Sequence, residues 1–184
     1  MGKNCIIIHG SPDNSKDDTY DKHWMPWIKK ELELRDIKTV VPRMPEPSKP
    51  VYEIYKKEFE KNLIDEDTIL IGHSRGCAFL VRWLGDSKQK VKKLILVAPY
   101  KVVVEKNKFK EEFSNFKIDK SIKECVQEIV IFTSDNEEVA GKESVNIYHK
   151  ALGGKIIELK GRGHYTFGDM GTEEFPELLN EIIK

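Results

Sequence analysis

The stretch Thr68–Gly76 reads TILIGHSRG, an apolar run that leads directly into Gly72-His73-Ser74-Arg75-Gly76. Apolar residues at helical spacing follow at Cys77, Leu80, Val81 and Leu84. This order predicts a strand, a tight turn and a helix, with Ser74 in the turn. Such a turn holds a serine hydroxyl on strained backbone, where it is free to attack a carbonyl carbon. Glycines two residues to either side leave room where a Cβ would clash with the neighbouring strand and helix.

Short apolar runs alternate with helix-periodic segments along the rest of the chain. Besides residues 68–71, strands are expected at 5–8, 39–41, 94–97, 128–132 and 155–159, and helices near 22–35, 51–63, 77–84, 145–152 and 175–183. Strands that are apolar throughout and separated by helices are typical of a parallel sheet covered on both faces. We therefore predict an α/β fold with a mostly parallel six-stranded sheet, in one domain spanning residues 1–184.

Residues 101–124 are the one poorly patterned stretch, rich in lysine and phenylalanine. They follow a predicted strand, at the sheet edge where ligands gather. Two interpretations have equal weight: a small lid over a binding site, or a helical connector.

The composition narrows the class of protein. Hydrophobic residues make up 39% and charged residues 34% of the 184 residues, as expected for a soluble globular protein. Lys+Arg and Asp+Glu both total 31, so the net charge is zero. It gives no electrostatic reason to expect nucleic acid or an anionic membrane as a partner. No signal peptide and no apolar run of about 18 residues is present. Three cysteines without short spacing indicate free thiols, and a cytoplasmic location is expected.

A serine nucleophile needs a base, and the base needs a carboxylate that fixes its tautomer. In α/β-hydrolases these groups follow one another in the order serine, acid, histidine. Asp135 follows the strand predicted at 128–132, and His164 lies in the loop after the strand predicted at 155–159. We predict a triad of Ser74, Asp135 and His164. Asp135 is preferred over the nearby Glu137 and Glu138 because it lies nearest the strand end.

Acyl transfer also needs backbone donors for the developing oxyanion. The residue after the nucleophile, Arg75, is expected to supply one N–H, and Ser11 in the loop after the first strand the other. Pro12 has no N–H to offer. Candidates for the substrate pocket are His9, Trp24, Tyr100, Phe109, Phe113 and Tyr165.

Several short motifs together resemble a known family. The chain contains Ile8-His9-Gly10, His23-Trp24-Met25-Pro26-Trp27-Ile28, Pro42-Arg43-Met44-Pro45-Glu46-Pro47, the Gly-His-Ser-x-Gly turn, Ser134-Asp135-Asn136 and a late Gly163-His164. In this combination it resembles the small α/β-hydrolases of the retinoblastoma-binding protein 9-like and YdeN-like serine hydrolase family. The resemblance covers essentially the whole chain. It implies that Ser74, Asp135 and His164 form the triad and that the sheet lacks the first two strands of larger members.

The sequence departs from the family pattern at two places near the predicted site. The family often continues Ser-Asp-Asn-Asp-Pro, whereas this chain has Glu137-Glu138 after Asn136, and Gly-Gly-His becomes Arg162-Gly163-His164. Neither departure removes a predicted catalytic group, and both are expected to affect access to the histidine.

These observations predict a serine hydrolase, most simply a carboxylesterase for small short-chain esters, working without metal or organic cofactor. A thioesterase, amidase or acyltransferase with the same triad is the nearest alternative. A protein-binding module that retains the hydrolase fold is the alternative from another class. A small-molecule ester is the expected partner, and a monomer or small homo-oligomer the expected state.

Overall fold

A computed structural model describes residues 4–104 and 106–184. Six strands form one sheet in the order β2-β1-β3-β4-β5-β6, and all neighbouring strands run parallel. The strands are β1 (Asn4–Ile8), β2 (Lys38–Val40), β3 (Thr68–His73), β4 (Val91–Val97), β5 (Val126–Ser134) and β6 (Lys155–Leu159). The helices are α1 (Met25–Glu33), α2 (Tyr52–Phe59), α3 (Arg75–Ser87), α4 (Lys108–Ser114), α5 (Ile122–Cys125), α6 (Val139–Leu152), α7 (Phe167–Met170) and α8 (Pro176–Ile183). The predicted six-stranded parallel sheet is confirmed.

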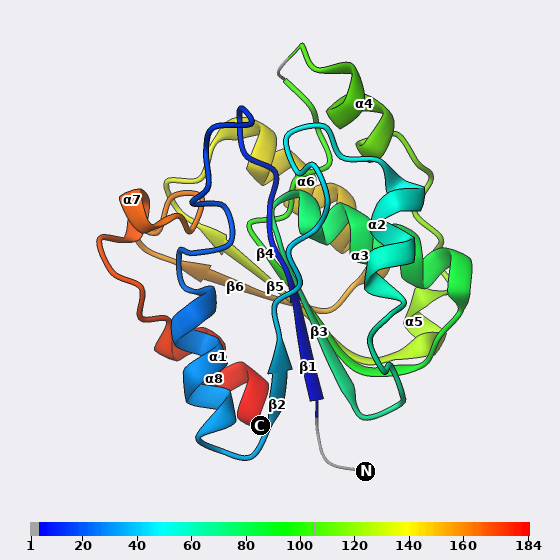
Figure 1. Cartoon of the computed structure of the whole chain (residues 1–184), viewed down its shortest axis with the longest axis vertical. Coiled ribbons are helices and arrows are strands. Elements are labelled where there is room, and N and C mark those ends of the chain that lie inside the picture. The colour runs from blue at the N-terminus through cyan, green and yellow to red at the C-terminus, as the bar shows by residue number, and fades with distance from the viewer. Residues whose placement is uncertain (1–3, 105) are drawn as a thin grey trace.

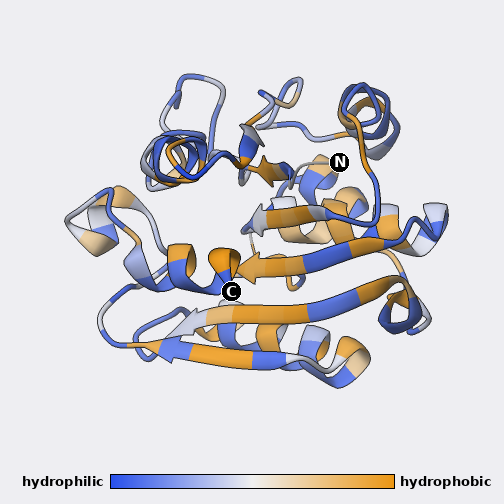
Figure 2. Cartoon of the chain, turned by 90° about the horizontal axis from the view of Figure 1, so that it is seen from below, coloured by the Kyte–Doolittle hydropathy of each residue, from blue (hydrophilic) through white to orange (hydrophobic). Residues whose placement is uncertain are grey.

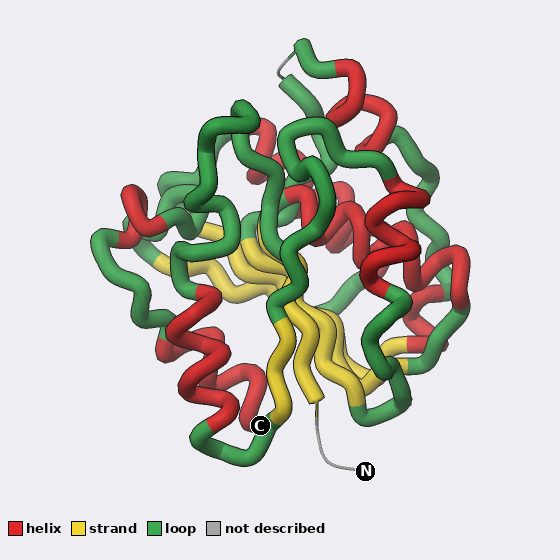
Figure 3. Tube along the Cα trace, viewed as in Figure 1, coloured by secondary structure: helices red, strands yellow, loops and turns green. Residues whose placement is uncertain are grey.

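Helices cover both faces of the sheet (Figures 1 and 3). Alternate side chains of β1 enter different cores: Ile6 and Ile8 pack with the apolar sides of α2, α3 and α6, whereas Cys5 and Ile7 pack with those of α1 and α8. The central strands are therefore apolar on both faces, as their long orange stretches in Figure 2 show. Burial of this apolar surface is the main force holding the layers together.

Two helices begin later in the chain than their apolar periodicity suggests. α1 starts at Met25 and α8 at Pro176, and each has a proline in its first turn. Proline fits there because its fixed φ suits the first helical turn and its missing N–H would have no partner within the helix. Trp24 and Phe175, which directly precede the first residue of each helix, are still buried but lie outside the helices.

The stretch 101–124 contains two short helices, α4 and α5, joined by irregular chain. Asn107 caps α4, since its side chain accepts a hydrogen bond from the backbone N–H of Lys110. Phe113 and Ile122 are buried in the core that contains α3. The segment is thus anchored at both of its helices.

The Ser74 turn depends on two glycines. Ser74 has φ 52° and ψ −119°, outside the regions that non-glycine residues usually occupy. A Cβ on Gly72 would lie 2.7 Å from the backbone nitrogen of Cys77, and a Cβ on Gly76 would lie 2.3 Å from the carbonyl oxygen of Ile8. The predicted clash with the neighbouring strand and helix is confirmed, because the backbone of α3 at Gly76 packs directly against the backbone at the end of β1.

None of the helices within residues 4–104 and 106–184 combines the length and apolar character needed to cross a bilayer.

Gly76→Ala is expected to destabilise the fold. The new methyl meets backbone oxygens of both Ile8 and His9, which cannot rotate away as a side chain would. We expect a loss of about 1–3 kcal/mol in the free energy of unfolding, measured by urea denaturation. The control is Gly168→Ala, because a Cβ there meets Thr166 Oγ1 at 3.7 Å, an ordinary contact. Equal stability of the two variants would show that the α3–β1 approach is not a constraint.

Candidate active site

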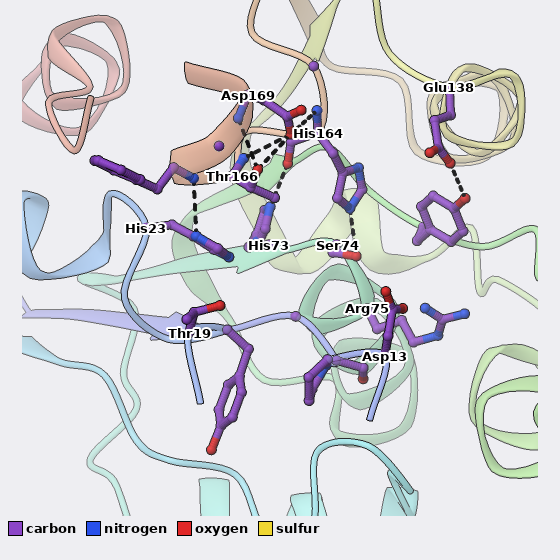
Figure 4. Close-up of a pocket in the computed structure, with 18 of the residues that line it drawn as sticks. Asp13, Thr19, His23, His73, Ser74, Arg75, Glu138, His164, Thr166 and Asp169 are labelled. Carbon is purple, nitrogen blue, oxygen red and sulfur yellow. Dashed lines mark hydrogen bonds between the residues drawn. The ribbon is translucent and has the colours of Figure 1, made fainter. Parts of the chain in front are cut away.

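Ser74 and His164 meet above the carboxyl end of the sheet (Figure 4). Ser74 stands between β3 and α3, and His164 lies in the loop between β6 and α7. The Oγ of Ser74 and the Nε2 of His164 are 2.9 Å apart. The structure therefore brings together the predicted nucleophile and the predicted base, which are 90 residues apart in the chain.

The carboxylate beside His164 belongs to Glu137. Its two oxygens lie 3.0 and 3.2 Å from His164 Nδ1, and its side chain is fully buried. A carboxylate accepts hydrogen bonds, so Nδ1 carries the proton and Nε2 is free to accept from the Ser74 hydroxyl. Gly141 of α6 makes space for Glu137, since a Cβ there would lie 2.7 Å from the glutamate Cδ.

The prediction that Asp135 contacts His164 is wrong. Asp135 is exposed, and its Oδ1 accepts a hydrogen bond from the backbone N–H of Gly161 at 2.8 Å. That bond holds the pKa of Asp135 below its usual value. After β5 the chain turns back on itself, with the N–H of Glu137 donating to the carbonyl of Ser134. This turn points Asp135 towards the β6 loop and brings Glu137 under the histidine.

A sequence signal for Glu137 did exist. The family pattern Ser-Asp-Asn-Asp contains two acids, and Glu137 occupies the position of the second. Nearness to the strand end favoured the first acid, but a turn after a strand changes which side chain faces the site. The substitution of glutamate for aspartate also hid the match.

The loop that carries His164 is held by side chains at the end of β5. The Oγ of Ser134 accepts a hydrogen bond from the N–H of Arg162, and the Oδ1 of Asn136 accepts one from the N–H of Gly163. Gly163 has φ 49°, in the left-handed region that favours glycine. The Ser-Asp-Asn motif thus shapes the loop, with Glu137 next in the chain reaching His164.

A cavity of about 920 Å³ opens at this serine–histidine pair. Ser74, His164 and Glu137 line it together with both predicted oxyanion donors, Ser11 and Arg75. Gly10, which directly precedes Ser11, approaches Ser74 closely, since a Cβ on Gly10 would lie 3.0 Å from the Cβ of Ser74. The loop after β1 therefore lies directly beside the nucleophile, as predicted.

Of the six predicted pocket residues, Tyr100 lines the cavity and the other five do not. Trp24 and Tyr165 are fully buried in the core beneath it, and Phe113 packs against Tyr55 in the opposite core. Phe109 is 43% exposed on α4, away from the cavity. Trp24, Phe113 and Tyr165 therefore pack the two cores, and Phe109 lies at the surface.

His9 is the remaining predicted pocket residue, and it is also structural. Its Nε2 accepts a hydrogen bond from the backbone N–H of Met44 at 2.9 Å, and its Nδ1 bonds to the carbonyl of Gly10 at 2.7 Å. Both ring nitrogens form hydrogen bonds, so His9 joins the loop after β1 to the loop at residues 42–47.

The cavity lining mixes polar and apolar surface and is rich in acids. Asp13, Asp17, Glu138 and Asp169 line it in addition to Glu137, and Arg75 is the one Lys or Arg side chain among the described lining residues. Burial lowers the pKa of two lining histidines, His23 and His73, which keeps their rings neutral near pH 7. The cavity therefore has negative electrostatic character.

Comparison with known proteins agrees with this site. The family model described as Serine hydrolase matches residues 5–182, and the chain belongs to that family. It is 26% identical over 182 residues to the putative hydrolase YdeN of Bacillus subtilis (strain 168), covering 96% of this chain and 92% of the relative. It is 27% identical over 176 residues to the serine hydrolase RBBP9 of Rattus norvegicus, covering 93% and 90%.

The crystal structure of the ydeN gene product from B. subtilis is similar over 98% of this chain and 97% of that one. The TM-score is 0.84 and the sequence identity 22%. The fold is accordingly that of an α/β-hydrolase, and the predicted resemblance is confirmed.

The contacts of His164 predict opposite outcomes for two neighbouring acids. Glu137→Gln is expected to lower turnover of a p-nitrophenyl ester by on the order of 10³–10⁴, because the amide no longer fixes the histidine tautomer or stabilises its charge. Asp135→Asn retains an acceptor for the Gly161 N–H and is expected to cost much less. Glu138→Gln, beside Glu137 and bonded to Tyr100, is the matched control. A severe loss in Asp135→Asn with a normal Glu137→Gln would reverse the assignment.

Proposed function

We propose that this serine hydrolase is a carboxylesterase for small esters, with Ser74, His164 and Glu137 as its catalytic triad. The observation that carries the proposal is the continuous hydrogen-bonded path from the Ser74 hydroxyl through His164 to a fully buried carboxylate. The Ser74 end of this path opens into a cavity large enough for a small-molecule substrate.

In the proposed reaction His164 Nε2 takes the hydroxyl proton as Ser74 Oγ bonds to the ester carbonyl carbon. Glu137 stabilises the resulting imidazolium while the carbonyl electrons move onto oxygen. When the tetrahedral intermediate collapses, the C–O bond to the alcohol breaks and His164 gives its proton to the leaving oxygen. Water then repeats the sequence on the acyl-enzyme, releasing the acid and restoring the serine. No metal or organic cofactor takes part in these steps.

The backbone N–H groups of Ser11 and Arg75 stabilise the oxyanion in this proposal. Arg75 is the first residue of α3, so its N–H points out of the amino end of the helix, where the positive end of the helix dipole lies. The close approach of Gly10 to Ser74 supports placing Ser11 at the same carbonyl oxygen. Two donors fixed in advance lower the barrier because they need not reorganise during the reaction.

The lining of the cavity supports a small, uncharged or cationic ester. Phe109 and Phe113, which were predicted to line the pocket, lie elsewhere, and the described lining combines carboxylates and histidines with a few apolar side chains such as Val104 and Phe167. Apolar surface makes up only part of the lining, so a long acyl chain would also meet polar groups, and an anionic group would meet several carboxylates.

The same path of hydrogen bonds also fits the thioesters, amides and acyl acceptors of the alternative enzymes. The lining of the cavity does not distinguish among these substrates. A protein-binding role is less well supported, because a scaffold does not require a buried glutamate aligned with a histidine and a strained serine.

A fluorophosphonate probe tests the proposed nucleophile. We expect covalent labelling of the wild type at Ser74 and none of Ser74→Ala, because only an activated serine displaces the probe's leaving group. Ester turnover in Ser74→Ala should fall by several orders of magnitude, since triad members act as a unit. Thermal unfolding serves as the control for folding. Labelling of Ser74→Ala at wild-type rate, or no reaction of the wild type, contradicts the proposal.

The cavity also predicts how rates depend on substrate. Hydrolysis of p-nitrophenyl esters should be fastest for acyl chains of roughly two to six carbons, because further methylenes remain in water and gain no burial energy. At equal length, an ester with a terminal carboxylate should react more slowly than its neutral counterpart, and added salt should reduce the difference. A maximum at ten or more carbons, or preference for the anionic ester, would be inconsistent with this cavity.

A further inference from the structure

The peptide groups of His164 are held from both sides by side chains of two other elements. His73, the last residue of β3, contacts its carbonyl, and Asp169, in α7, contacts its N–H. We infer that His73 and Asp169 are positioning residues that set the height and direction of His164 over Ser74. The inference rests on the proposed function, in which His164 is the base.

His73 donates to the His164 carbonyl. Its Nε2 lies 2.9 Å from that oxygen, and a carbonyl can only accept, so Nε2 carries the proton. Burial lowers the pKa of His73 well below its usual value, which leaves a neutral ring with unprotonated Nδ1. Nδ1 is buried and has no hydrogen-bond partner among the described residues. The ring thus keeps its proton on Nε2, although this leaves the buried Nδ1 without a hydrogen bond. We take this as a sign that the bond to the His164 carbonyl is the main polar role of His73.

The ring of His73 has little freedom to leave this position. It packs edge-on against Trp24 and His23, with centroid distances of 5.9 and 5.7 Å, and lies 5.3 Å from the His164 ring. Figure 4 shows it beside His164, under the loop that carries the base. Because His73 directly precedes Ser74, the same end of β3 fixes both the nucleophile and the height of the base.

Asp169 holds the other side of the peptide. Its Oδ2 accepts hydrogen bonds from the N–H of His164 at 3.0 Å and from Thr166 Oγ1 at 2.8 Å (Figure 4). Gly163 permits this approach, since a Cβ there would lie 2.6 Å from the Asp169 Cγ. The start of α7 is tied down in turn, because the N–H of Phe167 donates to His23 Nδ1 at 3.2 Å.

The two contacts act on different atoms from those of the triad. Glu137 orients the imidazole ring through Nδ1, whereas His73 and Asp169 fix the backbone from which the ring extends. A displacement of about 1 Å at a catalytic group can cost about 10²-fold in rate. Loss of either contact should therefore affect the chemical step and leave substrate binding largely unchanged.

The test compares variants that remove or retain each contact. His73→Leu removes the donor, and His73→Gln retains an amide N–H at the end of the side chain. Asp169→Ala removes the acceptor, and Asp169→Asn keeps a carbonyl oxygen without the charge. Asp65→Ala is the matched control for loss of a hydrogen-bonded aspartate, because Asp65 Oδ1 accepts from the Asp67 N–H and Thr68 Oγ1 at the amino end of β3 and does not line the cavity.

The measurements are the rate constant of fluorophosphonate labelling, kcat and KM for a short p-nitrophenyl ester, and the thermal midpoint. Each variant is made in the wild type and in a His164→Ala background. We expect His73→Leu and Asp169→Ala to lower kcat and labelling about 10- to 100-fold with KM unchanged. His73→Gln and Asp169→Asn should recover most of the loss, and Asp65→Ala should show none of it.

The His164→Ala background separates positioning from general stability. If His73 and Asp169 act through His164, their removal there should cause no further loss, because the group they position is gone. Equal losses in both backgrounds, or wild-type kcat in His73→Leu and Asp169→Ala, would overturn the inference while leaving the triad intact. A wild type that is not labelled at Ser74 would instead overturn the proposed function, and this inference with it.

Discussion

The contact between Gly76 and the carbonyl oxygen of Ile8 is the constraint on which the rest of the site depends. It lets α3 rest on β1 at backbone distance, and the chain between β3 and α3 must then turn sharply. Ser74 takes a positive φ in that turn, at a cost that the surrounding close packing offsets. The result is a serine raised above the sheet with its hydroxyl facing the β6–α7 loop.

The site is assembled at one edge of the sheet because all six strands run in the same direction. Their carboxyl ends place the loops after β1, β3, β5 and β6 around one cavity, and each loop contributes a different group. Ser11 follows β1, Ser74 follows β3, Glu137 follows β5 and His164 follows β6. Most of the large apolar side chains remain in the two cores below, and the charged and polar groups gather in the loops above them.

Hydrogen bonds from polar side chains of β3, β5, α7 and the loop after β5 fix the geometry of His164. Ser134 and Asn136 hold the two residues before it, Glu137 its ring, and His73 and Asp169 its peptide groups. Several of these groups are buried, so each hydrogen bond avoids the cost of leaving a polar atom unsatisfied. The loop at this sheet edge thereby holds the His164 ring in one orientation towards Ser74.

The sequence by itself determined the parallel sheet, the strand–turn–helix around Ser74 and the pairing of Ser74 with His164. Apolar periodicity and glycine positions report local structure and burial directly, and the order of strands limits which loops can meet. Only the tertiary structure decided that Glu137 and not Asp135 approaches His164, that Trp24, Phe113 and Tyr165 belong to the cores, and that His73 and Asp169 grip the peptide of His164. These depend on how side chains meet residues distant in the chain, through hydrogen bonds at the site and packing in the cores, which no local pattern records.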